Sequence, residues 1–141
     1  MIDDAKLWDE IDGVLFLKSS RWWNEEGQIV NLAMQLLHEN HQDRAQEIMD
    51  SGVGYMALSQ IYQMFNIIAD AAKIVGTQNL DSQALYEAAT SFALTIDGIQ
   101  RHSFNETKRD SVDFYAMYEA RAESEDIFRL NEEWFPTVRK P

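Results

Sequence analysis

The sequence predicts an α/β fold that is rich in helices and has few strands. A short, fully apolar run at residues 14–17 is typical of a parallel strand that is buried on both faces. Residues 111–120 alternate apolar and polar side chains, as a half-buried strand does. Between these two strands, residues 25–91 carry helical periodicity. A chain of 141 residues is long enough for one domain.

Composition excludes several classes of function. The chain has 24 acidic and 12 basic residues and a formal charge of −12, which argues against nucleic acid as a partner. It has no cysteine, so disulfides, thiolate metal sites and cysteine nucleophiles are excluded. No apolar run is long enough to predict a transmembrane helix. Residues 1–13 lack the basic start and apolar run of a secretory signal, so we expect no signal peptide in this chain.

The longest helical pattern covers residues 53–75. Apolar side chains recur there at three- and four-residue steps and define one face: Leu58, Ile61, Tyr62, Phe65, Ile68, Ala72 and Val75. The opposite side is mostly polar: Ser59, Gln60, Gln63, Asn66, Asp70 and Lys73. We expect the apolar face to be buried and Gly76 to form a left-handed C-terminal cap.

Shorter elements flank this helix. Amphipathic patterns predict helices at residues 25–40, 43–50 and 82–91, with Asp81 as the N-cap of the last, and a short helix at residues 2–11. Residues 92–110 are expected to be irregular, with a turn at residues 97–98, and residues 121–141 to form a charged tail.

This inventory leaves the sheet incomplete. A sheet of two strands is only marginally stable, and a fully apolar strand requires neighbours on both edges. We therefore infer that sheet partners come from outside these 141 residues. They would belong to another chain, a second copy or a longer parent protein.

Candidate ligand-binding residues follow the first strand. Ser19 and Ser20 come just after its C-terminal end, where open α/β sheets bind ligands. Trp22, Trp23 and Tyr55 are aromatic residues suited to the rim of a ligand site. The structural alternative is that one tryptophan packs on a helix and the serines cap the loop.

Catalytic and metal sites find less support. His38 and His41 are three residues apart near a helix end, but the spacing is not that of a zinc protease and no third ligand is identifiable. The pattern favours a structural role for these histidines over a metal site: they would be exposed and would interact with the carbonyl groups at the helix end. His102 is isolated in a segment expected to be a loop. We therefore expect no catalytic residue, metal or cofactor.

The order of elements resembles a known family. The segments that carry the likeness are Asp12-Gly-Val-Leu-Phe16, an aromatic loop, Gly54-Tyr-Met-Ala-Leu58, a long helix ending at Gly76, residues 80–89, Asp97-Gly98 and residues 113–119. Together they resemble the C-terminal portion of type I periplasmic solute-binding proteins, in particular the branched-chain amino-acid receptors of ABC importers. The likeness spans about residues 8–120.

The resemblance implies a fold and a function. In that family two α/β lobes close on a ligand like a hinged clamp. Residues 12–18 would form a strand leading into a hinge, residues 25–92 the helical part, residues 111–120 a return strand and residues 121–141 a tail. The implied activity is binding of a small polar solute, such as an amino acid or amide, without catalysis. The implied partner is an ABC permease, and the implied location is periplasmic or extracellular.

The chain departs from the family in length and in its N-terminus. Family members are more than twice as long and carry an export signal. The resemblance therefore implies a fragment of a type I periplasmic-binding-protein fold, with most ligand contacts in the parent's other part. A homodimer that supplies the missing strands is an alternative assembly. A second functional hypothesis is that the chain is a stand-alone helical protein, which dimerises through its apolar helix faces. A third hypothesis, a metal enzyme that uses His38 and His41, is the least favoured.

Overall fold

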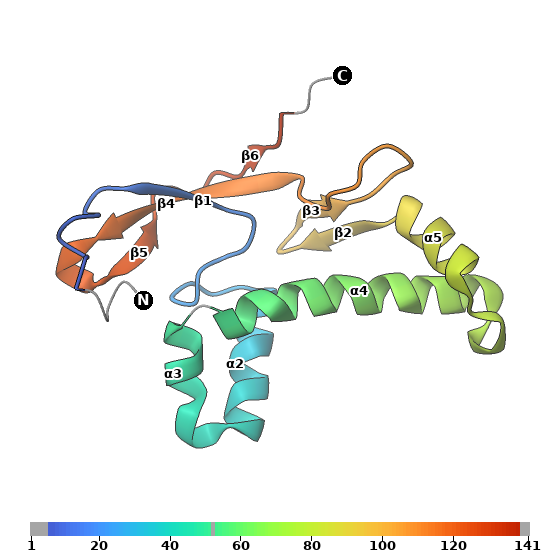
Figure 1. Cartoon of the computed structure of the whole chain (residues 1–141), viewed down its shortest axis with the longest axis horizontal. Helices are drawn as coiled ribbons and strands as arrows, with labels where there is room; N and C mark the ends of the chain where they lie inside the picture. The colour runs from blue at the N-terminus through green and yellow to red at the C-terminus, as the bar shows by residue number, and fades with distance from the viewer. Residues whose placement is uncertain (1–5, 52, 139–141) are drawn as a thin grey trace.

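The computed structural model describes residues 6–51 and 53–138, and it shows a mixed α/β fold with small antiparallel sheets (Figure 1). The α-helices are α2 (Gln28–Asn40), α3 (Ala45–Asp50), α4 (Val53–Val75) and α5 (Ser82–Thr90). The strands are β1 (Leu15–Lys18), β2 (Ala93–Ile96), β3 (Ile99–Ser103), β4 (Phe114–Arg121), β5 (Asp126–Arg129) and β6 (Phe135–Pro136). The predicted fold class, helix-rich with few strands, is confirmed.

The larger sheet is built around β4, which pairs with β1 on one side and with β5 and β6 on the other. All these pairings are antiparallel, with Phe16 opposite Tyr118 and Ala120 opposite Ile127. The prediction of a parallel strand buried on both faces at residues 14–17 is therefore wrong. Within residues 6–51 and 53–138, β1 pairs with β4 alone, and one face of β1 is open to solvent, so that Leu17 is 61% exposed.

The smaller sheet is a β2–β3 hairpin, which corrects the prediction of irregular chain at residues 92–110. Asp97 and Gly98 form its two-residue turn, and both have positive φ, 51° and 79°. This conformation suits the right-handed twist of a hairpin, and Asp-Gly is a favoured sequence for it. The predicted turn is thus confirmed. The strands around it were missed because Arg101 and His102 interrupt the apolar alternation.

The two ends of the described chain also differ from expectation. Residues 6–11 form turns rather than a helix, with the amide of Ile11 donating to the carbonyl oxygens of Leu7 and Trp8. The segment expected to be only a charged tail contains β5 and β6, both of which pair with β4. The sheet therefore draws more of its strands from this chain than the sequence indicated.

The helices follow the sequence closely. α4 has the predicted bounds. Gly76 after it has a φ of 81°, but its ψ of 149° lies outside the left-handed helical region, so the predicted left-handed cap is not formed. Asp81 caps α5 by accepting a hydrogen bond from the amide of Ala84 over 2.8 Å. Among the described helices, none is both long and apolar enough to cross a bilayer.

The orientation of α4 differs from the prediction in part. Its polar side faces the rest of the chain, and Ser59 and Gln63 are buried, Gln63 to 7% exposure. On the predicted apolar face, Ile61 is 44% exposed and Phe65 is 60% exposed. The rest of that face is half-buried: Leu58, Tyr62, Ile68, Ala72 and Val75. The elements of this chain therefore cover α4 mainly from the side that the sequence assigned to solvent.

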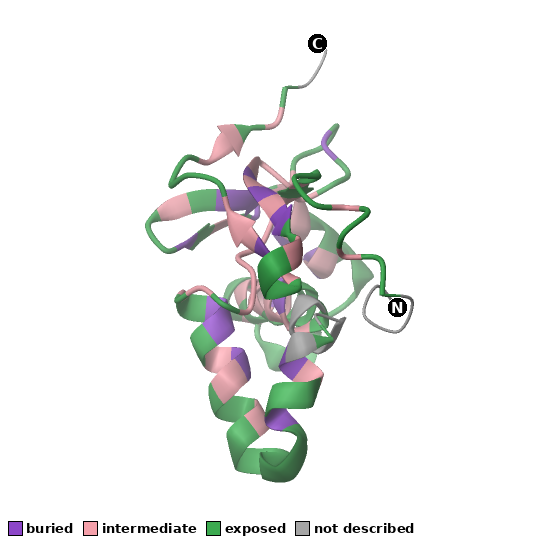
Figure 2. Cartoon of the chain, turned by 90° about the vertical axis from the view of Figure 1, so that its left-hand side faces the viewer, coloured by how far each residue is buried: buried purple, intermediate pink, exposed green. Residues whose placement is uncertain are grey.

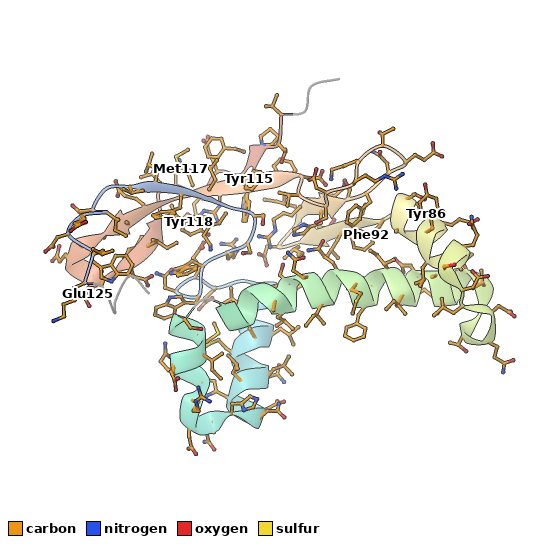
Figure 3. The ribbon with its side chains drawn as sticks, viewed as in Figure 1. Tyr86, Phe92, Tyr115, Met117, Tyr118 and Glu125 are labelled. Atoms are coloured by element: carbon orange, nitrogen blue, oxygen red, sulfur yellow. The ribbon has the colours of Figure 1, made fainter. Side chains whose placement is uncertain are left out.

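The buried apolar side chains that the structure describes form three small clusters. One joins α2 to α3 through Val30, Ala33 and Met49. A second joins α4 to α5, and a third lies under β4 and β5. Figure 3 shows Tyr118 on the side of β4 that faces the helices and Met117 on the opposite side. Figure 2 shows the far end of the α2–α3 pair as largely exposed.

Candidate functional site

A small cavity lies where the loop after β1 meets α2, α4 and the β2–β3 hairpin. Its volume is about 10 Å³. Seven of the residues that border it are polar or charged: Ser19, Ser20, Arg21, Ser59, Asp97, Arg101 and His102. Three aliphatic side chains complete it: Ile29, Val30 and Ile96. The loop after β1 therefore contributes to a pocket that it forms with residues far away in the sequence.

Asp97 accepts hydrogen bonds from three residues around this cavity. Its Oδ2 accepts hydrogen bonds from Nε of Arg21 over 2.8 Å and from Nη2 of Arg101 over 3.0 Å. Its Oδ1 accepts from the amide of Gln28 over 2.8 Å. Burial acts to raise the pKa of Asp97, but the Gln28 amide and the two guanidinium groups outweigh it and lower the pKa below its usual value. The carboxylate is therefore held in its charged form.

Asp97 also takes the place of an N-cap. The residue before α2 is Gly27, which has no side chain to cap the helix, and the first turn of α2 has no acidic residue. The turn of the hairpin supplies the missing carboxylate through the Gln28 amide. The position of α2 is thereby tied to the hairpin.

A second carboxylate, Glu25, extends the network toward the sheet. Its Oε2 accepts from Nη1 of Arg21 over 3.1 Å and from Nη1 of Arg129 over 3.2 Å. Its Oε1 accepts from the amide of Trp22 over 2.9 Å and from the hydroxyl of Tyr118. Burial, followed by the contact with Glu25, raises the pKa of Tyr118. The phenol is therefore a neutral donor at physiological pH.

Trp134 packs against both ends of the network. The guanidinium carbon of Arg101 lies 4.4 Å from its ring centroid, and that of Arg129 lies 4.6 Å away. Cation–π contacts of this kind are stronger when the cation is removed from water. Trp134 thus links the tail segment to the guanidinium groups that border the site.

Of the predicted ligand-binding residues, some line the cavity and others do not. Ser19 and Ser20 line the cavity. Trp22 and Trp23 are half-buried and are not among its lining residues. Tyr55 falls within α4, but its side chain lies outside the described residues.

Both tryptophans pack on the core. Trp23 contacts the cluster between α2 and α3, and Trp22 contacts that cluster and the one under β4. The indole Nε1 of Trp22 donates to Oδ1 of Asp126 over 2.6 Å, and Nζ of Lys18 lies 4.2 Å from the Trp22 ring centroid. Trp22 therefore anchors the loop that carries the two serines.

The histidines have no metal-binding arrangement among the described residues, where no group of three or more His, Asp or Glu side chains could hold a metal ion. His38 and His41 are exposed at the end of α2. His102 lies in strand β3 rather than in a loop and is buried. Burial first, and then the charge of Arg101, lower its pKa to about 4. It is therefore neutral at pH 7.

Sequence reasoning missed Arg21, Glu25, Asp97 and Arg101 as site residues. A signal was present for Asp97, since an Asp-Gly pair between apolar runs is a strong hairpin indicator. No signal was available for the others, because acidic and basic residues are common in the chain and their pairing is tertiary. Arg21 and Asp97 are separated by 76 residues.

Comparison with known proteins gives one structural relationship. No protein-family model matches the sequence, and no curated protein sequence matches it. Among solved structures, the fold matches part of a branched-chain amino-acid ABC transporter from Thermus thermophilus, solved with bound valine. The match has a TM-score of 0.64 and 13% sequence identity, and it covers 92% of this chain and 35% of that chain. The chain therefore has the fold of part of that protein.

Proposed function

We propose that this chain is part of a solute-binding protein of the ABC-importer type, and that the complete protein binds a small polar solute such as an amino acid or amide. The observation that carries the proposal is the structural match, which includes 92% of this chain. The order of elements in the sequence points to the same family independently of the coordinates. Because the chain spans 35% of the matched protein, the remaining part of the clamp would come from other residues.

The proposed mechanism is ligand capture between two lobes, without catalysis. Residues 12–18 lead into the hinge, residues 25–92 form the helical part, residues 111–120 return to the second lobe and residues 121–141 form a tail. A ligand that contacts both lobes stabilises the closed state and shifts the population toward it. The complete protein would act in the periplasm or outside the cell and deliver its solute to an ABC permease.

Ser19 and Ser20 are the proposed ligand-side residues with the best support in this chain. Their loop is held by the contacts of Arg21 with Asp97 and Glu25, and by the packing of Trp22. A loop fixed in this way orients hydroxyl groups at little entropic cost on binding. Trp22 and Trp23 would hold the serine loop in place by packing on the core. Tyr55, at the start of α4, remains a proposed ligand contact.

A thermal-shift panel of amino acids and amides tests the proposal on the complete protein that contains this sequence. A ligand at 100 times its Kd stabilises the native state by about 2.7 kcal/mol, which gives a readily measured rise in Tm. We expect Tm to rise with amino acids or amides of one chemical class, and not with sugars or nucleotides. A panel with no rise for any amino acid or amide would count against solute binding of this class.

Serine variants test the proposed contacts. Ser19→Ala and Ser20→Ala should each weaken binding of the identified solute, by about 5- to 30-fold for the loss of one hydrogen bond. Ser124→Ala is the matched control, because this serine is exposed in the turn between β4 and β5. Affinities equal to that of the control would remove the two serines from the site.

A second function is favoured by one observation, the exposed apolar side chains of α4. Ile61, Met64 and Phe65 are 44%, 49% and 60% exposed on neighbouring turns. A stand-alone protein of this sequence would cover them by dimerising through the α4 faces. Light scattering after size exclusion decides between the two functions: a dimer with no solute response supports this alternative, and a solute-responsive monomer excludes it.

A further inference from the structure

Asn105-Glu-Thr107 is the one Asn-x-Ser/Thr sequence in the 141 residues, and its middle residue is not proline. This pattern is the acceptor sequence for N-linked glycosylation, in which the asparagine amide receives a glycan. The hydroxyl group two residues later is the feature that the transferring enzyme recognises. A pattern this short also arises by chance, so its place in the fold decides whether the asparagine can serve as an acceptor.

The acceptor sequence lies on the surface, in the loop between β3 and β4, and all three of its residues are exposed. The base of this loop is fixed by the buried side chain of Lys108. Its Nζ donates to the carbonyl oxygens of Ser103 and Ser111 over 2.5 and 3.1 Å. The three exposed residues therefore project from an anchored loop, and a glycan attached there would not disturb the core.

The side-chain amide of Asn105 has its oxygen engaged and its nitrogen available. Oδ1 accepts hydrogen bonds from the backbone amides of Thr107 and Lys108 over 2.9 and 2.8 Å, and from the Thr107 hydroxyl over 3.0 Å. Backbone amides can only donate, so these contacts fix which end of the side chain is the oxygen. Nδ2 makes no hydrogen bond to a described residue, so a sugar can be attached to it without breaking a contact there.

An open groove beside the loop gives a glycan room on the folded protein. Its volume is about 250 Å³, and Asn105 itself lines it, together with Phe104 and with Tyr86 of α5. The guanidinium carbon of Arg109 lies 5.7 Å from the ring centroid of Tyr86, which shows that the loop and α5 are adjacent. Tyr86 is 46% exposed, and an exposed aromatic ring offers a flat apolar surface to the C–H groups of a sugar. The first sugar on Asn105 would enter this groove.

We infer that Asn105 carries an N-linked glycan in the complete protein that contains this sequence. This glycan presupposes the proposed function, because a solute-binding protein acts outside the cytoplasm, where such glycans are attached. The donor is an oligosaccharide joined to a lipid through phosphate. Nδ2 of Asn105 bonds to the anomeric carbon of the first sugar and gives one proton to the transferase. The bond from that carbon to the phosphate oxygen breaks, and its electron pair leaves with the lipid phosphate.

Tandem mass spectrometry of the complete protein, purified from its own source, tests the site. Trypsin cleaves after Arg101 and Lys108 and releases residues 102–108, in which Asn105 is the one asparagine. We expect this peptide to carry a sugar mass on Asn105. Expressed in the same source, Thr107→Ala should lose the modification, and Thr107→Ser should keep it because the hydroxyl is retained.

Asn131 is the matched control within the same chain. It is exposed, and its Oδ1 accepts a hydrogen bond from the amide of Glu133 over 2.9 Å, as that of Asn105 does from Thr107. The residue two positions later has no hydroxyl group, so the tryptic peptide of residues 130–139 should be unmodified. Glu133→Thr supplies the hydroxyl and should make Asn131 a second acceptor.

An unmodified peptide of residues 102–108 from the source organism overturns the inference. A modification that persists in Thr107→Ala also overturns it, since the sugar would then be attached without recognition of the acceptor sequence. Solute titration of the same preparation separates this proposal from the proposed function. A glycosylated protein that binds no solute contradicts the proposed function alone, and an unmodified protein that binds a solute contradicts the glycan alone.

Discussion

Arg21 donates a hydrogen bond from Nε to Oδ2 of Asp97 over 2.8 Å, although 76 residues separate them in the chain. The contact joins the loop after β1 to the turn of the β2–β3 hairpin. Because Asp97 also accepts from the amide of Gln28, the same carboxylate holds the N-terminus of α2. One side chain therefore fixes the relative positions of a loop, a hairpin and a helix, all of which border the cavity.

Replacing Asp97 by asparagine should lower the free energy of unfolding by about 1–3 kcal/mol at pH 7, since charge-assisted hydrogen bonds are lost. Urea denaturation measures the change. The pKa of Asp97 is lowered in the folded state, so its contribution is present above the usual pKa of 3.8 and is lost as pH falls below it. The difference between wild type and Asp97→Asn should therefore shrink in acid. Asp70→Asn, which removes an exposed pair with Lys73, should change stability by less than about 0.5 kcal/mol.

Gly27→Ala should disturb the same contact from the other side. A Cβ at this position would lie 2.5 Å from Cδ of Arg21, so the arginine side chain must move. The φ of Gly27 is 170°, which any residue adopts, and the effect is therefore steric. We expect a loss of about 1–3 kcal/mol. In a double-mutant cycle with Arg21→Ala, the two changes should be strongly non-additive, and additive changes would contradict the proposed clash.

His102 should make stability fall in mild acid. Its pKa is about 4 in the fold against 6.5 as its reference value, so the unfolded state takes up a proton first as pH decreases. The stability it confers is present above pH 6.5 and is lost between pH 6.5 and 4, by about 3 kcal/mol. His102→Gln should flatten this part of the pH profile measured by urea denaturation. His38→Gln, at an exposed position, should leave it unchanged; equal profiles for all three proteins would contradict a buried neutral histidine.

The apolar side of α4 should be covered in the complete protein. Under the proposed function, Phe65→Ser would then cost about 3 kcal/mol of stability, although the residue is 60% exposed within this chain. Ile74→Ser is the control, since Ile74 is 70% exposed and lies on the other side of the helix. Equal, small changes in Tm for both variants would show that nothing covers this face.

The helices could be predicted because their signals are local. The bounds of α4 and the cap of α5 at Asp81 each depend on residues a few positions apart. The direction in which α4 faces could not be predicted, because it depends on which elements pack against it. Gln63 is buried and Phe65 exposed for that reason.

The strands and the site required tertiary information. The apolar composition of β1 predicts a fully buried strand, but β1 lies at the edge of an antiparallel sheet. β5 and β6 are four and two residues long and carry no clear alternation. Ser19 and Ser20 were identifiable from their place after a strand, whereas Arg101 joins them only through the hairpin.

Calorimetric titration of the complete protein tests solute binding most directly. Wild type and the Ser19→Ala/Ser20→Ala variant would be titrated with the amino acid or amide that gives the largest thermal shift. We expect saturable 1:1 binding by wild type and a Kd raised at least about tenfold in the variant. Titration of wild type with every amino acid and amide of the panel without any binding heat, at several temperatures, would contradict it.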